Sequence, residues 1–290
     1  MSHLPFTITA YFFNALAVTA NKFLLKKVIP DPLVYVFYIS LVSVLAIFAL
    51  PFTKVPALDI FLIASASTIF WTIGAYFMFI ALKIGQVSRV IPIIGTLIPL
   101  ILLIFASSTN TLSQTQMIAI VILLIGMIFL TRSDLQGKLD KKELIFEILS
   151  AAAFAFSYII LRQAYLSLDF FSTIIWSRLV LLPLCLFMLL VPNIRKKIIT
   201  SKGPAINFFS KNGLIFLGGQ TTGIISEILL LFSISLANPA LVNSLQGTQY
   251  IFLLIFAIIF FKEKYNFTSL ISKITGIILI GSGLYLLAFS

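Results

Sequence analysis

The chain has 290 residues, of which 60% are hydrophobic and only 10% are charged, and its mean hydropathy is +1.14. These values exclude an ordinary soluble globular domain. The formal charge of +11 would suit nucleic acid, but the basic residues lie in short segments between long apolar runs, where lipid headgroups are the better partner.

Ten apolar runs follow one another along the chain, each close to the roughly 20 residues that a helix needs to cross a bilayer. Short segments with turn residues, such as "KKVIPDP" at 26–32 and "ANPA" at 237–240, separate them. Backbone groups in lipid must be hydrogen-bonded within their own segment, so the runs are predicted to be helices of an all-α integral membrane protein. The ten predicted transmembrane helices span residues 6–26, 33–51, 57–82, 86–106, 114–131, 143–163, 170–191, 212–236, 239–261 and 268–289.

The two halves of the chain are similar to each other. The polar segment at 132–142 divides the ten runs into five and five. Residues 81–105 align with 235–259, and residues 31–40 align with 169–178. Because each half has an odd number of spans, the copies must be inverted in the membrane, which is typical of transporters. We therefore expect two inverted five-helix repeats, residues 1–131 and 143–290, joined by a connecting loop at 132–142.

One acid, Glu227, lies in the middle of the apolar run "GQTTGIISEILLLFSISL" at 219–236. A charge at this depth is costly unless it faces a cavity or a partner. Gln220, seven residues earlier, lies on the same helix face. The functional hypothesis is a carboxylate that couples transport to protons or binds a cation. The alternative is a structural ion pair with Arg178 or with Lys22.

Other polar residues lie inside predicted spans. Arg178 either binds a substrate carboxylate or forms a structural pair with Glu227 or Asp169. The ninth span carries a polar stripe that either lines a substrate cavity or joins helices by hydrogen bonds. Further residues of the fourth and first spans are predicted to face the same cavity, and one of the third span, Tyr76, either adds to its wall or is a packing or aromatic-belt residue. The stripe is Asn243, Gln246 and Tyr250, and the further residues are Arg89, Asn21 and Tyr76.

Motifs of enzymes and of ATP-driven pumps are missing from the sequence. The single histidine, His3, lies in the N-terminal tail, and there is no metal-binding cluster, P-loop or GxGxxG. We expect no catalytic residue, no metal and no cofactor apart from a coupling proton. The driving force is then a gradient or the substrate itself. The alternative is an integral-membrane enzyme that acts on a polar or lipid-linked substrate, with Glu227 and Arg178 in its site.

The chain resembles the drug/metabolite transporter superfamily, in its ten-helix branch of two EamA-type halves. The resemblance rests on the small-residue-rich segments after "ALKIG" and "SLANPA", on Glu263 in "FFKEKYNFTS", on the last span "TGIILIGSGLYLL" and on the position of Arg178. It implies alternating access and efflux of a small polar metabolite, amino acid or drug-like molecule. It also implies a multi-pass protein of the plasma membrane, the inner membrane in bacteria. A monomer and a homodimer are both compatible with it.

The first half departs from the family pattern, with Ser40 in the place of the Arg and Thr109 in that of the Glu. Orientation is also in conflict. Basic residues gather in the loops that follow odd-numbered spans, which places both termini outside the cytoplasm. The family resemblance implies cytoplasmic termini. A reporter that is active only in the cytoplasm, fused after Ser290, distinguishes the two.

Overall fold

The computed structural model describes residues 3–85, 87–108, 112–132, 140–201, 210–261 and 266–288. All regular elements in this part of the chain are helices, which confirms the all-α prediction. In chain order they are α1 (His3–Lys27), α2 (Pro32–Ser43), the 3₁₀ helix η1 (Val44–Phe52), α3 (Leu58–Ile84), α4 (Val87–Ser108), α5 (Gln114–Thr131), α6 (Lys141–Ala164), α7 (Phe170–Arg178), α8 (Leu181–Leu190), α9 (Pro192–Thr200), α10 (Lys211–Leu236), α11 (Pro239–Ser244), α12 (Gly247–Phe261) and α13 (Phe267–Ala288).

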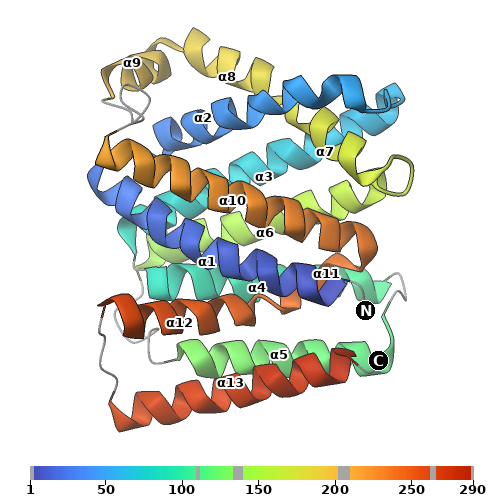
Figure 1. Ribbon diagram of the computed structural model, residues 1–290, viewed down its shortest axis with the longest axis vertical. Coiled ribbons are helices and arrows are strands. Elements are labelled where there is room, and N and C mark those ends of the chain that lie inside the picture. The colour runs from blue at the N-terminus through green and yellow to red at the C-terminus, as the bar shows by residue number, and fades with distance from the viewer. Residues whose placement is uncertain are drawn as a thin grey trace.

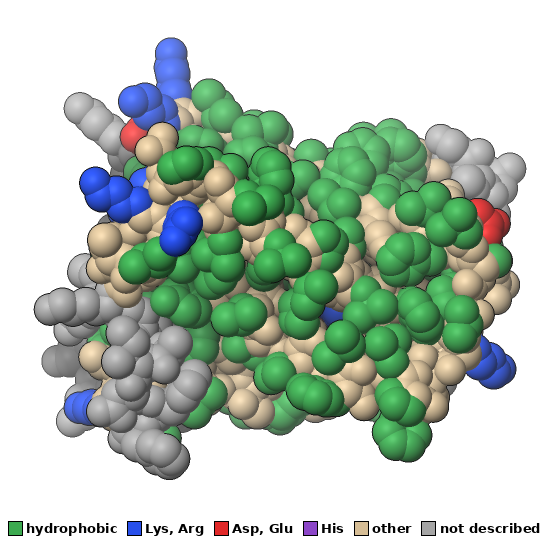
Figure 2. Space-filling model, turned by 90° about the horizontal axis from the view of Figure 1, so that it is seen from above, with side chains coloured by type: hydrophobic (Ala, Val, Ile, Leu, Met, Phe, Trp, Pro, Cys, Tyr) green, Lys and Arg blue, Asp and Glu red, His purple; other side chains and the backbone are tan. Residues whose placement is uncertain are grey.

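Within these described residues, seven helical segments are long and apolar enough to cross a membrane. Two of the seven are composite, because α2 runs on into η1 and α7 runs on into α8. Apolar stretches at Val90–Phe105 and Gln114–Leu130 are shorter. Hydrophobic side chains cover most of the face in Figure 2, whereas lysine and arginine side chains gather mainly at one end. These are the features of a multi-pass membrane protein.

Three antiparallel helix pairs organise the bundle: α1 with α10, α3 with α6, and α5 with α13 (Figure 1). The helix α4 and the broken segment α11–α12 lie between the first two pairs and the third. The helices α2, α7, α8 and α9 form a layer on the opposite side. Both termini lie at one end of the bundle, and α9 lies at the other.

The α1–α10 pair packs through small residues. A Cβ added at Gly219 would lie 2.8 Å from the Cβ of Ala20, and one at Gly223 would lie 3.7 Å from the Cβ of Ala17. At the other end of the pair, the Ser233 hydroxyl lies 3.5 Å from the His3 carbonyl oxygen. Close approach of this kind supplies the van der Waals contact that holds helices together in lipid.

The α5–α13 pair is equally close at Gly276. A Cβ there would lie 2.5 Å from the backbone nitrogen of Leu130 and 2.7 Å from the carbonyl oxygen of Gly126, and backbone atoms cannot move aside cheaply. We expect Gly276→Ala to lower the free energy of unfolding by about 2 kcal/mol, the scale of overpacking. Gly281→Ala on the same helix is the control, because a Cβ at Gly281 meets nothing within 4 Å. Thermal unfolding in detergent measures both, and equal midpoints would show that α5 and α13 are not tightly packed here.

Two of the predicted spans are broken, which the sequence analysis did not anticipate. The predicted helix 170–191 ends at Arg178 and resumes at Leu181. Pro183 explains the break, because it has no N–H with which to bond the carbonyl oxygen of Leu179. The predicted helix 239–261 ends at Ser244 and resumes at Gly247. Across that break the N–H groups bond carbonyls three residues back, as in a 3₁₀ turn.

Three basic side chains donate to the C-terminal carbonyls of neighbouring helices. The Lys22 amine lies 2.5 Å from the Leu82 oxygen and 2.7 Å from the Gly85 oxygen, at the end of α3. The Arg162 guanidinium donates to the last carbonyls of α10, and the Lys273 amine donates to Leu130 near the end of α5. A cation at a helix C-terminus is favourable because unsatisfied carbonyls carry partial negative charge there.

Candidate functional site

A cavity of about 160 Å³ lies inside the bundle, lined by residues of α1, α2, α3, α4, α6, α10, α11 and α12. Both halves of the chain therefore contribute to its wall. The apolar part of the wall includes Phe79, Ile94 and Phe154. Its polar part is dominated by carboxamides, namely Asn14, Asn21, Gln220, Asn243, Gln246 and Gln249.

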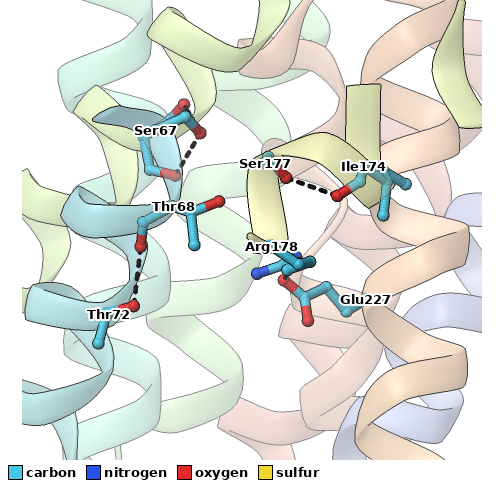
Figure 3. Close-up of polar contacts among 8 residues, drawn as sticks. Ser67, Thr68, Thr72, Ile174, Ser177, Arg178 and Glu227 are labelled. Carbon is cyan, nitrogen blue, oxygen red and sulfur yellow. Dashed lines mark hydrogen bonds and ion pairs between the residues drawn. The ribbon is translucent and has the colours of Figure 1, made fainter. Parts of the chain in front are cut away.

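Glu227 is the one acidic or basic side chain among the lining residues that the structure describes. Its carboxylate oxygen lies 2.5 Å from the Arg178 guanidinium, and the two side chains point toward one another from α10 and α7 (Figure 3). The Arg178 side chain is 9% exposed and that of Glu227 is 21% exposed. The carboxylate thus faces the cavity, while the guanidinium lies behind it.

Aromatic and hydroxyl side chains surround this ion pair. The guanidinium carbon of Arg178 lies 5.6 Å from the centre of the Trp71 ring, within cation–π range. The Thr72 and Ser177 hydroxyls donate to carbonyl oxygens of their own helices, 2.8 Å and 2.7 Å away (Figure 3). These hydroxyls are therefore already satisfied. The carboxylate and the ring hold the guanidinium in place.

Five of the six carboxamides belong to two hydrogen-bond chains that join helices across the cavity wall, whereas Asn243 donates to the Pro239 carbonyl of its own helix at 2.9 Å. In the first, Gln220 on α10 donates to the Tyr35 hydroxyl at 3.3 Å, and that hydroxyl donates to Asn21 on α1 at 2.6 Å. In the second, Gln246 donates to Gln249 at 3.4 Å. Gln249 in turn donates to Asn14 on α1 at 3.1 Å. Such groups can exchange partners with a bound molecule at low cost, because each carries both a donor and an acceptor.

Tyr250 does not line the cavity. Its hydroxyl donates to the Ile91 carbonyl at 2.8 Å, which joins α12 to α4. The crossing depends on Gly95, because a Cβ there would overlap the Tyr250 hydroxyl and the Gln246 amide. The predicted polar stripe is thus divided at the helix break. Asn243 and Gln246 face the cavity, and Tyr250 forms an interhelical hydrogen bond.

The remaining predicted site residues have different surroundings. Asn21 and Gln220 line the cavity beside Glu227. Tyr76 is half-buried near Phe77, with ring centres 5.8 Å apart, and is not among the lining residues. Arg89 lies in the first turn of α4, but its side chain is outside the described part of the structure. Glu263 and Thr109 also lie outside the described residues.

Sequence reasoning missed several functional candidates. Gln249 lies three residues after Gln246 and next to Tyr250, so a wider polar stripe that included both 249 and 250 would have found it. Tyr35 lies in the aromatic run "VYVFY", which carries no signal of polarity. From the sequence alone Trp71 was interpreted as a packing residue. The structure shows that its ring lies against the Arg178 guanidinium.

A pair of buried acids, Glu143 and Glu147, was also missed. They lie one turn apart near the start of α6 and are 1% and 0% exposed. The Glu143 carboxylate lies so close to Gly85 that a Cβ there would overlap it. Lys22 donates to the Gly85 carbonyl, so Lys22 and Glu143 both lie beside Gly85, at the C-terminal end of α3. The basic "KLDKK" segment before them favoured a loop, although two acids four residues apart at the start of a span are a recognisable signal.

Asp169 positions the helix that carries Arg178. Its carboxylate accepts a hydrogen bond from the Ser172 N–H at 3.0 Å and caps α7. That hydrogen bond, with help from the Ser172 side chain and Lys54, lowers the pKa of Asp169 although partial burial opposes it. The stability that this cap provides is fully present above the ordinary aspartate pKa of about 3.9. It is lost as the pH falls through the lower folded pKa.

We therefore expect Asp169→Ala to cost about 1 kcal/mol at neutral pH, the scale of a lost helix cap. Asp169→Asn keeps a capping oxygen that does not titrate, so its unfolding midpoint should fall less than that of the wild type on acidification. Thermal unfolding between about pH 6 and pH 3 measures both variants. An Asn variant with the acid response of the wild type would show that Asp169 contributes nothing to it.

Among the described residues, no group of three or more His, Cys, Asp or Glu side chains could hold a metal ion. No protein-family model matches the chain, and no curated protein is similar to it. Chains of solved structures do match, 27 in number. One, "Crystal structure of protein", is similar with a TM-score of 0.67 at 13% identity. The match covers 99% of this chain and 96% of that chain, and at 13% identity it shows the fold alone.

Proposed function

We propose that the protein is a ten-helix secondary transporter that moves a small polar molecule by alternating access. One observation carries the proposal. A cavity that both halves of the chain line contains a carboxylate that is ion-paired to a buried arginine, within a bundle of membrane-length helices. Ionisable groups inside a membrane bundle typically mark the path of an ion or substrate.

The helix packing supports two inverted repeats. Exchanging the halves replaces α1 by α6 and α10 by α3, and both α1–α10 and α6–α3 are close pairs. The aligned residues Asp31 and Asp169 each cap the helix that follows them. In each half, moreover, a basic residue of the first helix donates to the C-terminal carbonyls of the third, Lys22 in one half and Arg162 in the other. These correspondences support internal duplication with alternating access.

The cavity chemistry supports coupling through Glu227. Protonation of this carboxylate removes its charge, which releases Arg178 and leaves the carboxamides to bind substrate. Proton and substrate can each favour one arrangement of the helices only by binding the two arrangements with different affinity. The broken helices beside the cavity, α7–α8 and α11–α12, also fit this role, because irregular backbone at membrane depth is tolerated where it lines a cavity.

The same proposal includes the protein family and the membrane in which the protein lies. The chain then belongs with the EamA-type drug/metabolite transporters, in the plasma membrane or the inner membrane of a bacterium, and exports a metabolite, an amino acid or a drug-like molecule. The exposed basic side chains of α9, together with Lys211, lie at the end of the bundle opposite the termini. The positive-inside rule makes that end cytoplasmic.

Reconstitution tests the proposal against an enzyme. Purified protein in liposomes is loaded with a polar metabolite extract, and the external medium is sampled by mass spectrometry. A transporter releases a compound of unchanged mass, whereas an enzyme changes the mass of its substrate. Liposomes with Arg178→Met/Glu227→Gln are the control. Appearance of a new mass without net movement of any compound would reject transport.

A further inference from the structure

We infer that Lys22 and Arg162 hold the two ends of the cavity closed in the proposed transport cycle, one residue at each end. Each is called a latch below, and this inference rests on the proposed function. The relevant units are the α1–α10 pair and the α3–α6 pair. Helices within each pair are in close contact over their length, whereas direct contacts between the two pairs are far sparser. The cavity is lined by residues of both pairs.

Lys22 joins the two pairs at the end of the bundle where α9 lies. It belongs to α1, and its amine donates to two carbonyls at the C-terminus of α3, at 2.5 Å and 2.7 Å. Arg162 joins the same pairs at the end where the termini lie. It belongs to α6, and its guanidinium donates to the carbonyls of Ile234 and Ser235 on α10, at 3.1 Å and 2.5 Å. In Figure 1 the C-terminal ends of α1 and α3 lie at one end, and those of α6 and α10 lie at the other.

The Arg178–Glu227 ion pair joins the same two units near the middle, because α7 packs on α3 and Glu227 belongs to α10. The cavity thus has one central bridge and one basic latch at each end. Opening one end separates the pairs there and breaks only that latch. The freed Lys22 or Arg162 side chain then reaches water at the end of its helix, which makes the exchange of partners inexpensive.

Lys273 provides a matched control within the same chain. It is buried and donates to a helix C-terminal carbonyl, that of Leu130, at 3.3 Å. However, it joins α13 to α5, which form a pair of their own. Loss of Lys273 removes an interaction of the same chemistry without releasing either end of the cavity.

The test measures access to the cavity from each side without any substrate. Ser226, which lines the cavity, is replaced by Cys in a Cys185→Ala background, since Cys185 is the single cysteine of the chain. The protein is reconstituted in liposomes, and a C-terminal affinity tag separates vesicles by orientation. A membrane-impermeant maleimide is added outside, and the labelling rate is measured for each orientation.

Lys22→Met removes two charged hydrogen bonds. It should raise the labelling rate by at least about tenfold, the population shift expected for loss of a single one, in vesicles that expose the α9 end. Arg162→Met should do so in vesicles that expose the termini, and Lys273→Met should leave both rates unchanged. Lys22→Arg and Arg162→Lys keep a donor and should retain the parental rates. If a Met variant does not reconstitute, the Gln variant of the same residue takes its place.

Acceleration from both sides by either latch variant, or from neither side, would overturn the inference. Side-specific acceleration in a protein that moves no compound would leave the latches standing and reject the proposed function. Transport without side-specific acceleration of labelling would reject the latches and leave the proposed function standing.

Discussion

Arg178→Met is expected to lower the free energy of unfolding by about 3 kcal/mol, because it removes the partner of the Glu227 carboxylate. The value is at the low end for a broken buried pair because the Glu227 side chain is 21% exposed toward the cavity. Glu227→Gln should cost a similar amount, since it removes the carboxylate partner of the Arg178 guanidinium, whose side chain is only 9% exposed.

The double variant Arg178→Met/Glu227→Gln should lose less stability than the sum of the two single variants, by at least about 1 kcal/mol. Unfolding in detergent, monitored by the same probe for all four proteins, completes the cycle. Ser177→Ala is the neighbouring control, because the Ser177 hydroxyl donates only within its own helix. Strict additivity of the two single changes would show that the pair contributes nothing to the fold.

Glu227→Gln should also abolish the pH dependence of transport. In the proposed cycle, loss of the Glu227 charge breaks the ion pair with Arg178, so the balance between the two proposed helix arrangements depends on the charge at this position. An amide cannot take up a proton in this range, and the variant should move substrate at one rate at every pH. A carboxylate placed at position 220 (Gln220→Glu) should not restore the pH dependence to Glu227→Gln. The side chain at this position contacts Tyr35, whereas Arg178 contacts Glu227.

The coupling can be observed without substrate as well. The chain has two tryptophans, and Trp71 lies over Arg178. In a Trp176→Phe background, Trp71 fluorescence should therefore change with pH in the wild type and stay constant in Glu227→Gln. A variant that retains the pH response of the wild type, in either transport or fluorescence, would assign coupling to another group. The buried acids Glu143 and Glu147 would then be examined first.

The helical class and the two central charges could be predicted from the sequence. Long apolar runs with polar separators indicate the helices, and a charged residue inside such a run is easy to recognise. Glu227 and Arg178 are conspicuous within their runs, and a charge in such a place requires a partner or a cavity. Their pairing was one of several alternatives, since the approach of α7 to α10 depends on tertiary packing. Lys22 was also a candidate partner of Glu227, but it donates to α3 instead.

The break at 179–180 was not predicted, because the apolar run "LVLLPLCLFMLL" begins there without a turn residue. The break at 245–246 was not predicted, because the polar stretch "NSLQGTQ" around it was interpreted as one face of a continuous helix. A proline acts on the carbonyl four residues before it, so Pro183 marks a break upstream of itself. The division of the ninth span then separated Tyr250 from Asn243 and Gln246, which a single helix would have placed on one face. Periodicity assigns faces reliably only along an unbroken helix.

The proposed transporter moves a small molecule unchanged across the membrane through this cavity. Mass spectrometry of small molecules in cells and medium tests it directly, with cells that produce the wild type, Glu227→Gln, or no protein. We predict that one chemically unchanged compound accumulates in the medium only with the wild type. Identical profiles in all three, with each protein folded and present in the membrane, would contradict export through this site.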